Sequence, residues 1–103
     1  MSPRVRFEDE AEAEYRQAGR WYEERSTNLA FEFLDAVDET IERIVEHPRA
    51  GSLMPGLPAN VLVRRIAVRR FPYNLMYLEA EGQIRILAVA HDRRKPGYCK
   101  ARL

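Results

Sequence analysis

Ile84-Arg85-Ile86-Leu87-Ala88-Val89-Ala90 is the stretch of the sequence that decides the fold. It is short and almost unbrokenly apolar, as expected of a central β-strand that is buried on both faces. Glu81-Gly82, just before it, predicts a hairpin turn. Before that turn, apolar side chains alternate with a period of two, which predicts an antiparallel neighbouring strand. The alternating residues are Phe71, Tyr73, Leu75 and Tyr77, with Asn74 among the residues between them.

Further strand segments lie outside this hairpin. Residues 61–70 are rich in β-branched residues and arginine, and they predict a strand with one solvated face. Pro72 has no N–H to donate to a ladder, so it marks a turn or a sheet edge. Residues 52–60 contain two prolines and a glycine and predict a loop. At the start of the chain, Arg4-Val5-Arg6-Phe7 predicts a short additional strand.

Two amphipathic helices are predicted between the first strand and the loop. Glu8, Asp9 and Glu10 suit the first turn of the first helix, where carboxylates complement the dipole. Ser26-Thr27-Asn28 offers N-caps for the second helix after a short link, so the two form an antiparallel hairpin. His47-Pro48 and Gly51 end it. The predicted buried faces, with helical spacing, are Ala11, Tyr15, Ala18 and Tyr22, and then Ala30, Leu34, Val37, Ile41 and Ile44. The opposite face of the second helix carries Glu32, Asp35, Glu39, Glu42 and Glu46.

The predicted order is β-α-α-β-β-β, an α+β domain in which a helical hairpin packs on one face of a small, mainly antiparallel sheet. A chain of 103 residues corresponds to one domain, residues 1–103. No apolar run approaches the ~20 residues of a membrane span, and the acidic start lacks a signal peptide's apolar stretch. Cys99, the one cysteine, cannot form an internal disulfide, which indicates a reducing, cytoplasmic location.

Charge is divided unevenly along the chain. Residues 1–50 hold 13 acidic and 7 basic side chains, whereas residues 51–103 hold 3 acidic and 10 basic ones. Such asymmetry suits a polyanionic or acidic partner for the basic half. The alternative is that the two halves face each other and neutralise their charges internally.

Arginine dominates the basic half. Guanidinium groups bind phosphates and carboxylates through paired donors, so these side chains are candidates for binding a target or an antagonist. The candidates are Arg64, Arg65, Arg69 and Arg70 on or beside the strand at 61–70, and Arg93, Arg94 and Lys95 after the last strand. If the strands are neighbours, the two groups converge at one end or face of the sheet. A solvated strand face that pairs with the acidic helices is the alternative.

Aromatic side chains interleave with these arginines. Tyr73, Tyr77 and Tyr98 are possible stacking surfaces for nucleobases. The alternation predicts instead that Tyr73 and Tyr77 belong to the core, because they share a strand face with Phe71 and Leu75.

Few residues suit catalysis. There is no Gly-rich phosphate loop, and the two histidines and Cys99 lack the spacing of a metal site, so neither a cofactor nor a metal is expected. A metal-free ribonuclease needs a base, an acid and cations around the phosphate. His91, Arg93, Arg94 and Tyr98 offer such groups in one short segment. A hydrogen-bonded structural role is the alternative for His91.

Two segments carry a family resemblance. Residues 69–77 run Arg-Arg-Phe-Pro-Tyr-Asn-Leu-Met-Tyr, and residues 86–98 run Ile-Leu-Ala-Val-Ala-His-Asp-Arg-Arg-Lys-Pro-Gly-Tyr. With Trp21-Tyr22 and residues 33–51, they resemble the RelE/ParE superfamily, the toxins of type II toxin–antitoxin modules that are often labelled plasmid stabilisation proteins. The resemblance covers nearly the whole chain and implies the β-α-α-β-β-β order predicted above.

The resemblance implies one of two activities. RelE-like members are ribosome-dependent mRNA endonucleases, and ParE-like members inhibit DNA gyrase without being nucleases. The RelE-like branch typically has an arginine that helps to hold the scissile phosphate at the position of Asn74. Tyr98 does match a tyrosine position of that branch, and Arg94 falls in its basic segment. If the chain is a nuclease, the catalytic candidates are these two residues together with His91 from the acid–base set above. The neutral Asn74 favours the ParE-like, non-enzymatic activity.

The resemblance also implies an antitoxin, which wraps the toxin's helices, sheet or both in a hetero-oligomer. The basic strand face suits acidic residues of such a segment, and the apolar helix faces suit its hydrophobic anchors. The second partner is DNA gyrase or, in the alternative, the ribosome with mRNA. A member that only binds its antitoxin and has lost toxicity is the third possibility.

Overall fold

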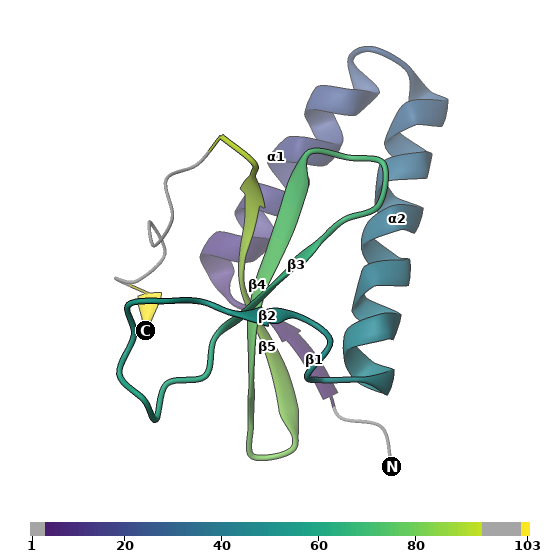
Figure 1. Ribbon diagram of the computed structural model, residues 1–103. Helices are drawn as coiled ribbons and strands as arrows, with labels where there is room; N and C mark the ends of the chain where they lie inside the picture. Colours follow the sequence, from purple (N-terminus) through teal and green to yellow (C-terminus); the bar gives the residue numbers. More distant parts are fainter. Residues whose placement is uncertain (1–3, 94–101) are drawn as a thin grey trace.

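The computed structural model describes residues 4–93 and 102–103 and shows two helices packed on a sheet (Figure 1). The α+β class and the helical hairpin on one face are confirmed. The elements are β1 (Arg4–Phe7), α1 (Asp9–Glu23), α2 (Thr27–Glu46), β2 (Ser52–Leu53), β3 (Arg64–Ala67), β4 (Tyr73–Ala80) and β5 (Gln83–His91). Neither of the two helices in the described chain combines the length and the apolar character that a membrane crossing requires.

The strands form one sheet in the order β1-β5-β4-β3-β2. β4 and β5 pair antiparallel from Tyr73 opposite His91 to Ala80 opposite Gln83. The predicted turn at Glu81-Gly82 joins them, and its residues have positive φ angles of 54° and 75°, the geometry that matches strand twist. β1 pairs parallel with β5, whereas the other pairs are antiparallel. β5 is therefore an interior strand, as its apolar sequence predicts.

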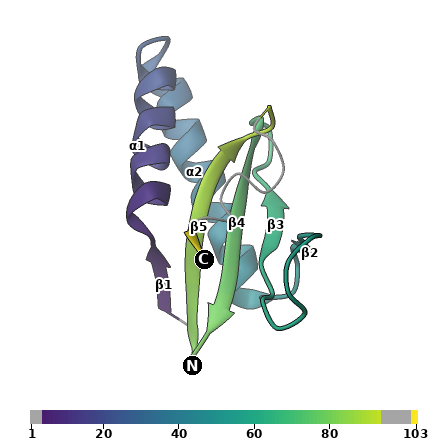
Figure 2. The same cartoon turned by 90° about the vertical axis from the view of Figure 1, so that its left-hand side faces the viewer.

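The helices cover one face of the sheet (Figure 2), because each presents an apolar stripe to it. Phe33 of α2 lies at the centre, with its ring 5.1 to 5.4 Å from those of Tyr22, Phe71 and Tyr73. Ser26 caps α2 by accepting a hydrogen bond from the Leu29 N–H. The buried face of α2 differs from the prediction: Leu34 and Ile41 are only half-buried, and the face also includes Phe33, Ala36 and Thr40.

A second, smaller cluster lies on the other face of the sheet. It joins Met76, Val63 and three residues of β5, Leu87, Ala88 and Ala90, and loop side chains such as Met54 and Leu57 pack against it. Met76 is opposite Ala88 and Tyr77 is opposite Ile86, so Leu87 is an extra residue in a β-bulge. The bulge turns Ile86 toward the helices and both Leu87 and Ala88 away from them.

Three predicted boundaries are wrong. The loop predicted at 52–60 begins with β2, which pairs with β3 through its backbone; a strand of two exposed residues leaves no pattern in the sequence. The strand predicted at 61–70 is only Arg64–Ala67, because residues 69–72 turn back toward β4. The strand predicted from Phe71 begins at Tyr73, after Pro72, and continues to Ala80.

Candidate interaction sites

Three candidate arginines lie on neighbouring segments at one end of the sheet. Arg69 and Arg70 occupy the turn between β3 and β4, and Arg93 follows β5. The Asp92 N–H donates to the Pro72 carbonyl at 2.8 Å and ties these two segments together. All three arginine side chains are exposed. The segments that carry Arg69, Arg70 and Arg93 are therefore neighbours at this end of the sheet.

Arg64 and Arg65 lie further along β3, away from that end. The Arg64 guanidinium donates to the Gly51 carbonyl at 2.8 Å and to the Arg49 carbonyl at 3.4 Å, so it braces the segment after α2. Arg65 is exposed and pairs across the ladder with Met76, on the face turned away from the helices. Of these two, Arg65 is the better placed to meet a partner.

The two halves of the chain do neutralise part of their charge internally. Arg85 pairs with Glu8, and Arg102 pairs with Glu14 and, at 3.6 Å, with Glu10. Arg69 and Arg70 are different, because they border hollows beside the acidic face of α2. Within the described part of the chain, neither comes within ion-pair distance of those carboxylates.

Asn74 and His91 lie on opposite faces of the sheet. Asn74 alternates with Tyr73 and Leu75, which face the helices, and its Nδ2 donates to Asp92 Oδ1 at 2.6 Å. His91 is on the helix side, where its ring meets Tyr73 edge-on at 5.2 Å. Its Nδ1 accepts a hydrogen bond from the Arg93 N–H at 3.1 Å. The structure therefore does not bring His91 and Asn74 together around one phosphate.

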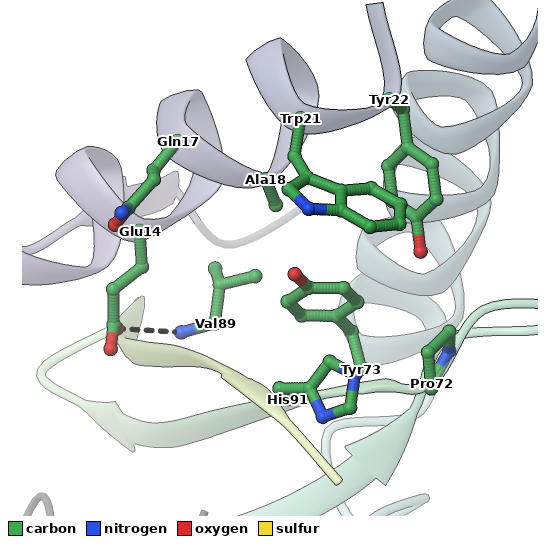
Figure 3. A pocket seen from close by; sticks show the side chains of 9 residues that line it. All are labelled: Glu14, Gln17, Ala18, Trp21, Tyr22, Pro72, Tyr73, Val89 and His91. Atoms are coloured by element: carbon green, nitrogen blue, oxygen red, sulfur yellow. Dashed lines mark hydrogen bonds between the residues drawn. The ribbon is translucent and has the colours of Figure 1, made fainter. Parts of the chain in front are cut away.

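A hollow of about 340 Å³ opens between α1 and the end of β4 and β5 (Figure 3). Trp21 and Tyr22 border it from α1, and Tyr73 and His91 border it from the sheet; Glu14, Gln17, Ala18, Pro72 and Val89 complete the lining. Trp21 is 48% exposed, and the Arg25 guanidinium stacks on its ring at 3.3 Å from the centroid. The hollow is thus aromatic at one end and polar at the other, where Glu14 lies.

The tyrosines of this region are core residues with polar tips. Burial raises the pKa of Tyr73 above its usual 10.0. Burial also raises the pKa of Tyr22, with a smaller contribution from Tyr73. Both hydroxyls therefore stay protonated at neutral pH. Tyr77 is fully buried, as the alternation predicts, and Tyr73 is half-buried.

Some predicted residues lie outside the described chain: Arg94, Lys95, Tyr98 and Cys99. Among residues 4–93 and 102–103, no group of three His, Cys, Asp or Glu side chains is arranged to hold a metal ion. The hollow itself is not predicted from the sequence, because Glu14, Gln17 and Trp21 look like ordinary helix-surface residues until α1 is placed beside β5.

Comparison with known proteins agrees with this architecture. Residues 5–96 match the family model described as the ParE toxin of type II toxin-antitoxin system, parDE. A chain of the chromosomal ParDE TA system from P. aeruginosa has a TM-score of 0.70 at 15% identity, covering 87% of this chain and 96% of that one. The S. aureus YoeB dimer structure has a TM-score of 0.58 at 13% identity, covering 88% and 98%. Curated protein sequences gave no match. Because the family model spans most of its length, the chain belongs to the ParE toxin family of type II toxin–antitoxin systems.

Proposed function

We propose that this ParE-family toxin arrests growth by inhibiting DNA gyrase, acts without being an enzyme, and is neutralised by a bound antitoxin. Family membership supports the toxin role and the existence of an antitoxin partner. The choice of gyrase rests on the resemblance to the ParE-like branch and on the surroundings of Asn74. The lone cysteine of the sequence supports action in the cytoplasm.

The pairing of Asn74 with Asp92 is the observation that carries the choice of target. RelE-like nucleases resemble this chain, but they have an arginine at the position of Asn74 that stabilises the phosphate. Here the Asn74 amide is held at 2.6 Å by the Asp92 carboxylate. A carboxylate at that point repels a phosphate, where a nuclease needs a cation. His91 cannot make up for this, since it faces the helices on the other side of the sheet.

Gyrase inhibition is tested with the purified, antitoxin-free protein in a supercoiling assay. We expect supercoiling to fall in proportion to toxin added, and mRNA on translating ribosomes to stay intact. Pulse labelling in the first minutes after induction gives the matching observation in cells, where DNA synthesis should fall before protein synthesis.

The other outcomes each identify a different function. If protein synthesis falls first and Tyr98→Phe weakens mRNA cleavage, the RelE-like endonuclease is correct and the proposal is wrong. If neither synthesis changes and growth continues, the chain is an antitoxin-binding member without toxicity.

Exposed arginines are proposed to contact the antitoxin. Arg65 and Arg69 are exposed and lie outside the ion pairs of the described chain, so acidic residues of the antitoxin can reach them. We expect Arg65→Glu and Arg69→Glu each to weaken antitoxin binding by about tenfold, the usual order for a charge-assisted hydrogen bond. Titration calorimetry measures this, with Arg16→Glu on α1 as the control. Unchanged affinity in both variants places the antitoxin elsewhere.

A further inference from the structure

The two helices form a layer whose outer side faces away from the sheet. The sheet lies against one side of both helices (Figure 2), and no helix or strand of the described chain lies over the other. Phe31 precedes the buried Phe33 of α2 by two residues, which is about 200° around a helix of 3.6 residues per turn. Phe31 therefore lies on the outer side. Positions i, i+3, i+4 and i+7 share this side of α2, namely Phe31, Leu34, Asp35 and Asp38.

Phe31 is the most exposed large apolar side chain of the described residues, at 59%. Leu34, one turn further along α2, is half-buried, and its Cδ2 lies 3.9 Å from the point where a Cβ of Gly19 on α1 would be. Because Gly19 has no side chain, another molecule can approach the backbone of α1 closely here. A single exposed apolar residue is common on protein surfaces. This one is distinguished by the glycine and the charges around it.

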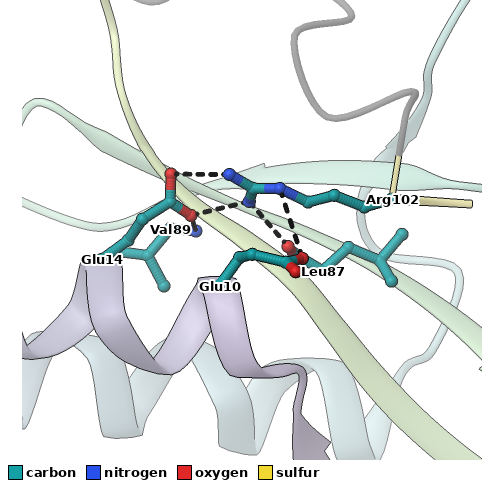
Figure 4. A network of polar contacts seen from close by, with 5 residues as sticks. All are labelled: Glu10, Glu14, Leu87, Val89 and Arg102. Carbon is teal, nitrogen blue, oxygen red and sulfur yellow. Dashed lines mark hydrogen bonds and ion pairs between the residues drawn. The ribbon is translucent and has the colours of Figure 1, made fainter.

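Several charged side chains of α1 are paired within the chain. On the side toward β5, Arg102 pairs with Glu14 at 2.9 Å and with Glu10 at 3.6 Å (Figure 4). Elsewhere on α1, Arg16 pairs with Glu12 at 2.6 Å. These side chains therefore have partners already, and a second molecule is not needed to neutralise them.

Arg20 is the cation that α1 presents on its outer side. It lies two residues from each of the buried Ala18 and Tyr22, and therefore on the opposite side of the helix. It is exposed and forms no ion pair with the residues that the structure describes. A carboxylate of a second molecule can reach it.

α2 presents the opposite charge at nearly the same level. Asp35 and Asp38 are exposed and form no ion pair within the described chain. Burial raises the pKa of Asp38, and Asp35 raises it further, so a cation from a second molecule would stabilise both carboxylates. Arg20 follows Gly19, and Asp35 follows the neighbouring Leu34. Arg20 and Asp35 therefore lie within about one helical turn of the same level.

This outer side is complementary to a second copy of itself. A two-fold axis parallel to the helices places α1 of each copy antiparallel over α2 of the other and keeps the level of every residue. Arg20 of each copy then lies opposite Asp35 of the other, so the ion pair forms twice. Phe31 of each copy lies within about one turn of Gly19 of the other. The four helices form an antiparallel bundle.

We propose that the outer side of the helical hairpin, at Gly19, Arg20, Phe31 and Asp35, is a self-association site through which two copies of this chain form a symmetric dimer. Charge decides the occupant, because a partner of one sign would leave either the arginine or the carboxylates unpaired. Two helices about 20 Å long and 10 Å wide offer on the order of 400 Å² per copy. That is below the ~800 Å² of a standard interface, so the dimer is weak and depends on concentration.

Sedimentation equilibrium of the purified, antitoxin-free, full-length chain measures this association over a wide range of concentrations. The variants are Arg20→Glu, Asp35→Arg and Phe31→Ser. Arg43→Glu is the matched control, because Arg43 is exposed on the side of α2 that borders Arg69. Thermal unfolding confirms beforehand that each variant is folded, as expected for exposed positions.

We expect the wild type and Arg43→Glu to dimerise as concentration rises. Arg20→Glu and Asp35→Arg should each weaken the dimer about tenfold, since like charges then face each other at both symmetry-related contacts. Phe31→Ser should weaken it by about tenfold or more through loss of apolar burial. An equimolar mixture of Arg20→Glu and Asp35→Arg should dimerise like the wild type, because each variant supplies the charge that the other has lost. A role within one chain would not be rescued by mixing.

Several results overturn the proposal: a monomer at every concentration, a dimer that tolerates the charge reversals or Phe31→Ser, or a mixture that associates no better than its components. The inference does not depend on the proposed function. None of these measurements involves gyrase or an antitoxin, so failure of gyrase inhibition and failure of the self-association site are separate outcomes.

Discussion

Tyr77 links the buried face of the sheet to the segment that follows α2. Its hydroxyl donates to the Pro48 carbonyl at 2.8 Å and accepts from the Gly51 N–H at 2.9 Å. A Cβ at Gly51 would come within 2.8 Å of that hydroxyl and 2.9 Å of the Arg65 carbonyl. A glycine is therefore required here by close approach, not by backbone angle.

Gly51→Ala should lower the free energy of unfolding by about 1–3 kcal/mol, the usual cost of overpacking. Gly19→Ala is the matched control, because its nearest neighbour, Leu34 Cδ2, is at an ordinary 3.9 Å. That change in the middle of α1 should raise stability by about 0.5–1 kcal/mol. Urea unfolding measures both, and equal effects of the same sign would contradict the packing argument.

Arg70 has an unusual backbone conformation. Its φ is 72° in the turn that the Phe71 N–H closes onto the Val68 carbonyl. A left-handed conformation costs a non-glycine residue about 1–2 kcal/mol. Strain of this kind is found at functional positions, and the exposed Arg70 follows Arg69 in the same turn.

The substitution Arg70→Gly removes both the backbone strain and the guanidinium of Arg70, which affect two different measurements. The variant should gain about 1 kcal/mol of stability through relief of strain and lose toxicity if the guanidinium contacts the target. Arg69→Gly is the control, since Arg69 has no positive φ and should not be stabilised by glycine. Thermal unfolding and growth arrest are measured in parallel. A less stable Arg70→Gly protein would contradict the assignment of strain.

At the scale of elements, α2 carries an acidic row along its solvent side. Asp38 belongs to this face although the sequence pattern does not include it. Burial raises the pKa of Asp38 above its usual 3.8, and the neighbouring Asp35 raises it further. Asp38 and Asp35 also add to the effect of burial in raising the pKa of Tyr15. Asp35 and Asp38 are therefore like charges that lie close to each other and to Tyr15.

The raised pKa of Asp38 makes the stability of the fold depend on pH. A carboxyl whose folded-state pKa is raised binds its proton more tightly in the folded protein, so its ionisation destabilises the fold. This contribution to stability therefore falls as pH rises through the interval from 3.8 up to the raised value.

Asp38→Asn should raise the free energy of unfolding at pH 7 by about 0.5 kcal/mol, the usual size of a like-charge pair on a helix. Near pH 3, where the wild-type carboxyl is neutral, the difference should vanish. Thermal unfolding at the two pH values measures this. An advantage that persists unchanged at low pH would mean that charge is not the cause.

At the scale of the whole molecule, the acidic half and the basic half are joined at the β1–β5 side. Arg85 pairs with Glu8 and Arg102 pairs with Glu14, so ion pairs between residues distant in sequence stabilise this side of the sheet. At the other edge, β2 pairs with β3 over only two exposed residues. Stability should therefore be distributed unevenly across the sheet.

Native-state hydrogen exchange should show this gradient. Amides of β5 that pair with β4, such as those of Ala88 and Ala90, should exchange only on global unfolding. Amides at the β2–β3 edge should exchange by local opening at a much lower free energy. Equal protection at both edges would contradict the uneven distribution.

The sequence alone predicted those parts of this protein that depend on local patterns. The apolar run at 84–90 predicted an interior strand, Glu81-Gly82 predicted the hairpin, and two amphipathic stretches predicted the helical pair. These predictions are correct because the spacing of apolar residues and the residue types of a turn depend only on residues that are close together in the sequence. The family resemblance, carried by residues 69–98, was likewise visible without a structure.

The tertiary structure alone decided the features that depend on distant residues. It placed Asn74 and His91 on opposite faces of the sheet. Side chains alternate between the two faces along a strand, and the bulge at Leu87 shifts this alternation for the later residues of β5. It brought Glu14 and Arg102 to the backbone of β5, at Val89 and Leu87, across the length of the chain. It showed that the pairing of β1 with β5 ends where Phe7 lies opposite Ile86. No local pattern holds this information, because it is fixed by register and by packing between elements far apart in sequence.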